Sequence, residues 1–343
     1  MKSTVCIAED REVCEPALKL LLLSLSRHSS AQTISLFYPP ASPAFISWLE
    51  KCPQVRLQTD RLKNDYGWNV KPQAIMHLMD QGFDEVIWID SDIIVTRDMG
   101  WILAKLKNDT LVATEHTLSE ERDDRNARRA RLWNLPVGRT LPFALSSGVV
   151  RVTKVHYHLM ERWWELLQSK EYQDFQRTEW RQRPVHMLGD QDVLTALLTS
   201  KEFSEIPIEI LRRGKHILQF DGVYGYTVAE RTRNLLGDGP VFVHSGAGKP
   251  WSERWQPANG MREYIKQVYL DVSPYTLYAL RFKGELGSDT QWMEPHYKLA
   301  RILRILGLGY PPLIGLPMAI FADLGRIAKY IGKSRQPEND DAP

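Results

Sequence analysis

The sequence predicts an α/β protein with a mostly parallel sheet, because short segments rich in β-branched residues alternate with helical segments near its start. Helices that separate successive strands in this way are typical of βαβ units, whose strands run parallel. We expect strands over residues 5–8, 33–38, 55–58 and 85–89, separated by helices over residues 13–27, 43–51 and 71–82.

The composition is that of a globular protein. Of the 343 residues, 43% are hydrophobic and 25% are charged, which excludes disorder over most of the chain. A chain of this length can bury a full core and hold one large or two ordinary domains. The net charge of +2 indicates no preference for polyanions, so we expect no nucleic-acid partner.

The cysteines predict a cytoplasmic protein, and the N-terminal region is not expected to be a signal peptide. Charged residues at 9–12 interrupt it before any apolar stretch long enough for a signal peptide. The apolar residues 20–25 are too few to span a bilayer and are interpreted as the buried face of the first helix. The cysteines are odd in number and lack zinc-like spacing, so we expect reduced thiols at Cys6, Cys14 and Cys52.

Two carboxylates follow an apolar run of strand length. Residues 86–94 read Val-Ile-Trp-Ile-Asp-Ser-Asp-Ile-Ile, which places Asp90 and Asp92 where the chain leaves the core. One residue between them lets both face a common divalent cation, and hard oxygen ligands suit Mg²⁺ or Mn²⁺. An ordinary acidic turn is the alternative. Ligands bind beyond the carboxyl ends of parallel strands, and this position favours the metal site.

The middle of the chain is more ambiguous. A strand is expected over residues 111–115, and the polar, Arg-rich residues 119–140 are either a long loop or mobile lid, or a solvated charged helix. Order returns with a strand over 147–153 and an aromatic-rich helix through Trp163 and Trp164. A further helix over 189–199 and a strand over 240–243 follow, and there is no internal repeat.

Four other features are candidates for binding or catalysis. The run 189–192 opens a helix, so its carboxylate and amide side chains are expected to face outward at an electropositive end, although Asp190 could simply cap the helix. Residues 146–148 are interpreted as a tight turn that could form the floor of a sugar pocket. Lys71 precedes a helix on the side of the metal strand, although solvent exposure is usual for such a lysine.

The fourth feature is the run 244–251, which reads His-Ser-Gly-Ala-Gly-Lys-Pro-Trp after a strand. Its glycines permit close approach of backbone to a ligand, and Lys249 offers a charge for phosphate. A single histidine at a strand end is usually structural. An imidazole from His244 beside two carboxylates would favour Mn²⁺ over Mg²⁺.

Taken in order, these motifs resemble the retaining glycosyltransferases of family eight, the group of glycogenin and the bacterial lipopolysaccharide galactosyl- and glucosyltransferases. The resemblance covers roughly residues 3–255 and is carried by residues 86–92, 146–150, 190–192 and 244–251. It implies a GT-A fold, a single Rossmann-like α/β domain that binds Mn²⁺ and a nucleotide-sugar donor, usually a UDP-sugar. The acceptor would be a hydroxyl of a glycan or glycolipid.

The resemblance also implies roles for individual residues. The metal ligands would be Asp90, Asp92 and His244, and the donor sugar would lie at Asp190 and Gln191. The remaining donor-binding residues would be Ala8, Glu9 and Asp10 at the uridine, Lys71 and Lys249 at the diphosphate, and Ser91, Ser147, Gly246 and Gly248 around them.

Two departures and several alternatives remain. The family often has Asn where Ser146 stands, and the loop 244–249 is one residue shorter than in well-known members. Retention could arise by front-face attack or through a covalent intermediate on Asp190 or Gln191. A sugar-phosphate nucleotidyltransferase is disfavoured because no Gly-rich, basic phosphate loop follows the first strand. A non-catalytic membrane-associated scaffold is disfavoured by retention of the motifs.

The C-terminal segment carries a separate prediction. Residues 296–335 hold seven Lys and Arg against one acid, Asp323, and the basic residues of 298–306 recur at helical spacing beside apolar ones. This pattern indicates a basic amphipathic helix that lies on an anionic membrane, here the inner face of the cell membrane, with an ordinary docked helix pair as the alternative. Prolines make a spanning helix unfavourable.

We therefore divide the chain into a GT-A domain (1–270), a helical membrane-associating extension (271–335) and a disordered acidic tail (336–343).

Overall fold

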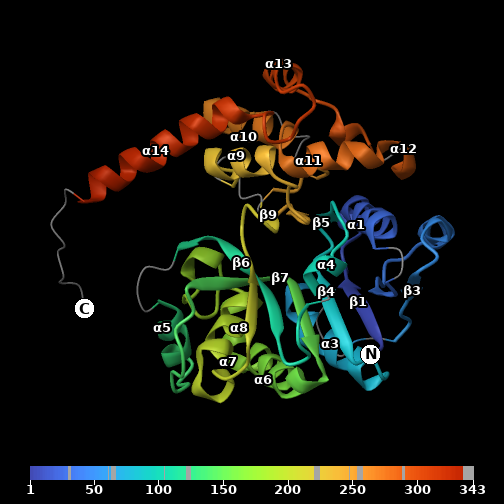
Figure 1. Ribbon diagram of the computed structural model, residues 1–343, viewed down its shortest axis with the longest axis vertical. Coiled ribbons are helices and arrows are strands. Elements are labelled where there is room, and N and C mark those ends of the chain that lie inside the picture. The colour runs from blue at the N-terminus through green and yellow to red at the C-terminus, as the bar shows by residue number, and fades with distance from the viewer. Residues whose placement is uncertain are drawn as a thin grey trace.

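The computed structural model (Figure 1) has a seven-stranded sheet with helices on both faces and a smaller three-stranded sheet beneath a helical layer. It describes residues 1–29, 32–60, 62, 67–103, 105–120, 125–219, 225–246, 248–252, 258–287 and 290–334. The predicted acidic tail at 336–343 lies outside the described residues.

The sheet is mixed but mostly parallel, as the sequence predicts. Its order is β3-β2-β1-β4-β7-β6-β8; β7 is antiparallel to both of its neighbours, and the other described pairings are parallel. The strands of this sheet are β1 (Ser3–Ala8), β2 (Ile34–Phe37), β3 (Val55–Leu57), β4 (Glu85–Ile89), β6 (Leu111–Glu120), β7 (Phe143–Thr153) and β8 (Ile208–Leu211).

The smaller sheet has the order β5-β10-β9, formed by β5 (Ile93–Val95), β9 (Ile217–Gln219) and β10 (Phe242–His244). Strand β10 runs antiparallel to β5 and parallel to β9. The first helices are α1 (Glu15–His28), α2 (Pro43–Trp48), α3 (Lys71–Asp80), α4 (Gly100–Leu103) and α5 (Arg125–Leu132). The later ones are α6 (Tyr157–Gln168), α7 (Lys170–Gln176), α8 (Asp190–Thr199), α9 (Val228–Leu236), α10 (Met261–Asp271), α11 (Pro274–Ala279), α12 (Lys283–Leu286), α13 (Lys298–Leu306) and α14 (Leu316–Ser334).

Strand β4 is buried on both faces because it lies inside the sheet between two hydrophobic cores. Its side chains alternate, so that Ile87 and Ile89 pack into the core formed with α1, whereas Val86 and Trp88 pack into the core formed with α3, α6 and α8. Residues 20–25 of α1 are all buried, as predicted. The rigid packing of β4 fixes the point at which Asp90 leaves the sheet.

Two expectations for the middle of the chain need correction. Residues 146–148 are not a tight turn: they lie within β7, where Ser146 pairs with Thr114 of β6. The Arg-rich region is neither wholly a loop nor wholly solvated, because β6 extends to Glu120 and α5 packs on α8 through buried Ala127 and Ala130. Residues 121–124, part of the expected lid, lie outside the described residues.

The C-terminal helices are fastened to the rest of the molecule by buried polar contacts. The guanidinium of Arg231 donates to the carbonyl oxygens of Tyr226, Pro311, Pro312 and Ile314. Asp271 Oδ2 accepts from the backbone N–H groups that precede α13, at residues 296 and 297. Between these contacts along the chain, Tyr275, Trp292 and Met293 belong to the core that contains α1. Over the described residues, no helix is both long enough and apolar enough to cross a bilayer.

Candidate functional site

The paired aspartates lie where β4 passes into β5. The backbone N–H of Asp90 donates to Gly148 O at 2.9 Å and so extends the β4–β7 ladder by one residue. The chain then turns tightly, with Ile93 N–H donating to Asp90 O at 3.1 Å. Asp90 thus ends the large sheet and Asp92 precedes the small one, which holds both carboxylates at the junction between the sheets.

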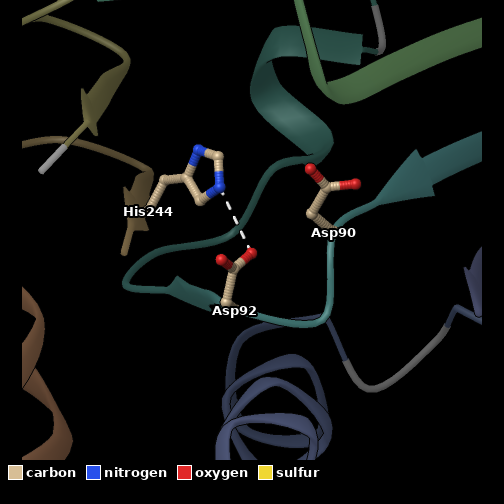
Figure 2. A group of neighbouring side chains, drawn as sticks. All are labelled: Asp90, Asp92 and His244. Carbon is tan, nitrogen blue, oxygen red and sulfur yellow. Dashed lines mark ion pairs between the residues drawn. The ribbon is translucent and has the colours of Figure 1, made fainter. Parts of the chain in front are cut away.

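Pairing between β5 and β10 brings His244 to this junction. The antiparallel register places His244 opposite Ile93, and Ser245 N–H donates to Asp92 O at 3.0 Å. The side chain of His244 therefore faces the aspartates, as Figure 2 shows. Its Nε2 lies 3.2 Å from Asp92 Oδ1.

The three side chains form a set that fits a divalent cation. One ligand atom from each of Asp90, Asp92 and His244 lies within 4.8 Å of the others. Nε2 is the ring nitrogen of His244 that faces the aspartates, whereas Nδ1 is buried on the other side of the ring and has no hydrogen-bond partner within the described ranges. Two carboxylates and an imidazole are a donor set that transition metals such as Mn²⁺ accept.

Gly148 of β7 makes room for this set. A Cβ atom at that position would lie 3.2 Å from His244 Cε1 and 3.3 Å from its Nδ1, which is closer than ordinary contact. The same Cβ would lie 3.6 Å from Asp90 Oδ2. The absence of a side chain in the Ser-Ser-Gly motif therefore serves the histidine and the aspartate directly.

Lys249 forms an ion pair with Asp92. Its ammonium also donates to the carbonyl oxygens of Ser245 at 2.6 Å and Gly246 at 3.2 Å, which holds the 244–249 loop over the aspartate. Burial alone would raise the pKa of Asp92, but Lys249 and His244 more than offset it and hold that pKa well below the usual range. Burial lowers the pKa of His244, but Asp92 outweighs it and the pKa is raised.

A second cluster joins Asp90 to Asp190. Lys71, the first residue of α3, is buried, and its Nζ lies 2.7 Å from Ser147 Oγ, 3.0 Å from Asp90 Oδ1 and 3.2 Å from Asp190 Oδ2. The Ser147 hydroxyl donates to Asp190 Oδ2 at 2.6 Å. Burial opposes the charge on Lys71, but Asp190 and Asp90 outweigh it and raise its pKa. The solvent-exposed alternative for Lys71 is wrong.

The start of α8 differs from the expectation that its carboxylates face outward, because Asp190 and Asp192 are both buried. Asp190 does not cap the helix: Gly189 holds the cap position, and its N–H donates to Asp192 Oδ2 at 3.1 Å. Burial raises the pKa of Asp192 to about 6 although Arg129 lies 3.1 Å away. Gln191 is partly exposed beside them.

The end of β1 carries the residues predicted to hold the nucleoside. The Glu9 carboxylate is buried and accepts hydrogen bonds from Arg11 and, at 2.5 Å, from the Ser91 hydroxyl. Burial raises the pKa of Glu9, but Arg11 and Ser91 outweigh it and lower the pKa overall. Asp10 is half-buried and follows Glu9. Ser91 thus links the nucleoside end of the predicted site to the aspartate turn.

Two contacts at the candidate site were missed by reasoning from the sequence. Trp88 Nε1 donates to Asp90 Oδ1 at 2.7 Å and orients this carboxylate. The signal was present, since residues two apart share one face of a strand. Trp163 of α6 donates to Asp190 O at 2.9 Å and anchors the start of α8, a contact between distant elements that no local pattern reveals.

Comparisons with known proteins find similarity in structure only. No family model matches the chain, and no curated protein matches its sequence. A WbbM bifunctional glycosyltransferase structure aligns at a TM-score of 0.49 and 14% identity over 82% of this chain, which spans about half (51%) of that protein. GlyE, a glycosyltransferase of Streptococcus pneumoniae TIGR4, aligns at 0.44 and 15% identity over 83% of this chain and 64% of that one.

A third structure is a glycosyltransferase involved in glycosylation of the major capsid of PBCV-1, with a TM-score of 0.39 and 12% identity over 71% of this chain and 93% of that one. Similarity at these levels decides nothing about activity. The chemistry of this chain therefore has to be argued from its own site.

Proposed function

We propose that the protein is a metal-dependent retaining glycosyltransferase that moves a hexose from a UDP-sugar to a hydroxyl of a glycan or glycolipid acceptor. One observation carries this proposal: His244, from a distant part of the chain, converges with Asp90 and Asp92 within 4.8 Å at the carboxyl end of β4. Lys249 and Lys71 lie directly against the two aspartates. Carboxylates that hold a cation beside lysines suit a diphosphate leaving group.

In this proposal Asp90, Asp92 and His244 hold Mn²⁺, with Mg²⁺ as a possible substitute. The bound cation supplies Lewis-acid stabilisation of charge on the leaving diphosphate. Lys249 gives up part of its contact with Asp92 and donates to a phosphate oxygen. Lys71 would do the same only by giving up one of its contacts with Ser147, Asp90 or Asp190.

The other predicted contacts have positions consistent with this arrangement. Glu9 and Ser91 hydrogen-bond to each other at the end of β1, and Asp10 and Ala8 are their neighbours, so this end would receive the uridine. Gly246 and Gly248 form the loop that Lys249 closes over Asp92. Backbone without bulky side chains permits close approach of the diphosphate there.

The reaction breaks the bond between the anomeric carbon and the diphosphate oxygen, and UDP departs with the electron pair. A bond then forms from the acceptor oxygen to that carbon, and the acceptor proton passes to a phosphate oxygen of UDP. In the front-face route, Asp190 and Gln191 stabilise positive charge on the sugar. In the alternative route, one of them forms a transient covalent bond to it. Asp190 is fixed for either role by Ser147 and Lys71.

A screen of UDP-sugars tests the proposal. We expect Mn²⁺-dependent release of UDP from one UDP-hexose, loss of release with a chelator, and retention of the anomeric configuration by NMR when an acceptor is added. Asp92→Ala and His244→Ala are expected to lower turnover at least about a hundredfold. Asp174→Ala and His158→Ala, at exposed residues far from the site, are matched controls and are expected to retain it.

The same screen separates the two alternatives. A sugar-phosphate nucleotidyltransferase would release pyrophosphate from a nucleoside triphosphate rather than UDP from a UDP-sugar. A non-catalytic scaffold would bind no UDP in the presence of Mn²⁺. Either result would overturn the proposal.

A further inference from the structure

Helix α13 has a wide apolar side, of which one part is buried and the other is exposed. Ala300 and Leu303 are buried and pack with residues of α10 and α11. The remaining apolar residues lie three or four positions apart, so they share the outward side of the helix. These exposed residues are Leu299, Ile302, Ile305 and Leu306.

Exposed apolar residues also follow α13 along the chain. Leu308 and Tyr310 lie in the loop, and Leu308 is 77% exposed. On α14 the small residues Ala319 and Ala322 face inward, while large ones are exposed, with Phe321 at 75%. Both helices belong to the layer that lies farthest from the seven-stranded sheet (Figure 1). We call the set the C-terminal apolar face: Leu299, Ile302, Ile305, Leu306, Leu308, Tyr310, Ile320, Phe321, Leu324 and Ile327.

This face is held in place. Arg304 donates to the carbonyl oxygens of Asp271 at 2.7 Å and Met293 at 2.8 Å, which fixes α13 on the helical layer. Arg231 fixes the loop that leads to α14. Helix α13 is fixed to the rest of the molecule, so its large exposed apolar side chains do not belong to a flexible tail. Exposed apolar patches of this kind mark interaction surfaces.

The charged residues of α13 are all of one sign. Residues 298–322 contain Lys298, Arg301 and Arg304 and no acid. Asp323 follows, but its carboxylate accepts from the N–H of Val228 at 3.0 Å and pairs with Arg326. Lys298 and Arg301 flank the apolar row on α13 itself, so an approaching partner meets apolar side chains edged with positive charge.

We propose that the C-terminal apolar face docks on an anionic lipid bilayer, with its large side chains in the headgroup and acyl boundary and its basic residues on the phosphates. A second copy of the chain fits less well, because a twofold contact would bring Lys298 and Arg301 toward the same charges of its partner. Docked in this way, the protein would lie on the surface of a membrane that contains anionic lipids.

Vesicle sedimentation of the full chain tests this inference. We expect binding to phosphatidylcholine vesicles that contain about 30% phosphatidylglycerol, weaker binding to pure phosphatidylcholine, and release at high salt. Ile305→Ser with Phe321→Ser is expected to weaken binding at least about tenfold, because both side chains are exposed and would enter the bilayer. Lys298→Gln with Arg301→Gln is expected to weaken it about fivefold per charge and to reduce the salt effect.

The controls use exposed apolar residues of the opposite side. Val155→Ser with Trp180→Ser changes residues beside α6 and α7 and should leave binding unchanged. These point variants are preferable to removal of the segment, which would uncover the side chains packed against Ala300 and Leu303.

Two outcomes would overturn the inference. In one, the wild type and the Ile305 and Phe321 variant bind anionic vesicles equally. In the other, the wild type ignores vesicles but self-associates in light scattering, and the same substitutions make it monomeric. That second result would assign the face to a second copy of the chain.

Discussion

Two lysines neutralise the carboxylates of the candidate site. Lys249 pairs with Asp92, and Lys71 lies between Asp90 and Asp190. The difference between them is burial, since the Lys71 side chain is 4% exposed and that of Lys249 is 23% exposed. Lys249 can therefore exchange Asp92 for a ligand at low cost, whereas Lys71 is part of the folded core.

This difference predicts the effect of removing Lys71. Lys71→Met should cost about 3–5 kcal/mol of folding free energy, because Asp90 and Asp190 lose their shared buried cation. Adding Asp190→Asn to that variant should recover part of the loss. Denaturant unfolding with and without Mn²⁺ measures both effects, and Mn²⁺ should stabilise the Lys71 variant more than the wild type.

The control for Lys71 is Lys154→Met, which breaks an exposed pair with Asp84 and should leave the free energy of unfolding nearly unchanged. A similar small cost for Lys71→Met, or no recovery with Asp190→Asn, would contradict the assigned contacts.

His244 predicts how metal binding depends on pH. Its raised pKa means that the metal-free protein holds a proton on the imidazole into the neutral range, and that proton must leave before the ring binds a metal. Mn²⁺ affinity should therefore rise as the pH increases from 6 toward 8, by up to about tenfold per unit while the ring is protonated. Because the pKa of His244 is raised in the fold, the protonated imidazole stabilises the metal-free protein at low pH. This contribution to the free energy of unfolding is lost as the pH rises and the ring loses its proton.

Calorimetric titration with Mn²⁺ at several pH values measures this dependence. In His244→Gln the dependence should be much weaker, because the amide does not titrate. Equal slopes in the two proteins would remove His244 from the set of ligands.

At the scale of elements, the site depends on close approach between strands β7 and β10. Gly148→Ala places a Cβ against the His244 ring and should lower Mn²⁺ affinity about tenfold or more while the fold persists. Gly284→Ala in α12 is the matched control, since its Cβ would meet no atom within 4 Å. Mn²⁺ titration and a thermal melt measure the two effects. Unchanged Mn²⁺ affinity in Gly148→Ala would show that Gly148 does not limit the position of the His244 ring.

Element patterns also explain which parts of the structure could be predicted from sequence. Strand β4 was predicted with its observed bounds because an uninterrupted apolar run indicates a strand buried on both faces. Strands β5, β8 and β9 were missed: β5 lies in the same apolar run as β4, and the short β8 and β9 each include a polar residue, Glu209 or Gln219. The strand character of residues 146–148 was obscured by two serines and a glycine, which are common in turns.

The candidate site was predictable only in part. Asp90 and Asp92 could be assigned from a local pattern, but His244 reaches them through β5–β10 pairing, a contact between distant segments that periodicity does not encode. The burial of Lys71 is a similar case. It follows from the meeting of α3, β7 and α8, and a lysine at a helix start gives no sign of it.

At the scale of the whole molecule, the helical layer and the large sheet meet at the aspartate turn, because β5 and β10 belong to the smaller sheet beneath that layer. The cores are continuous across this junction: Trp251, Tyr275 and Trp292 contact one another within the core that also contains α1. Substitutions in the C-terminal half are therefore expected to change the free energy of unfolding of the whole fold.

Arg231 tests this connection. Arg231→Met leaves several buried carbonyl groups without their donor and should cost about 3 kcal/mol or more, with faster proteolysis near residues 308–316. The control is Arg233→Met, because Arg233 lies on the same helix but is exposed. This substitution should change the free energy of unfolding by less than about 0.5 kcal/mol. Equal stability of the two variants would show that the C-terminal helices are not fastened through Arg231.

The central claim is that Asp90, Asp92 and His244 hold a divalent cation that recruits a nucleoside diphosphate. Electron paramagnetic resonance of Mn²⁺ measures this directly, because the signal of free Mn²⁺ falls when the ion is bound. The account predicts that the protein with UDP removes the free signal at close to one ion per chain, and that His244→Ala and Asp92→Ala do not, whereas His158→Ala does. A free Mn²⁺ signal unchanged by the wild type with UDP would contradict it.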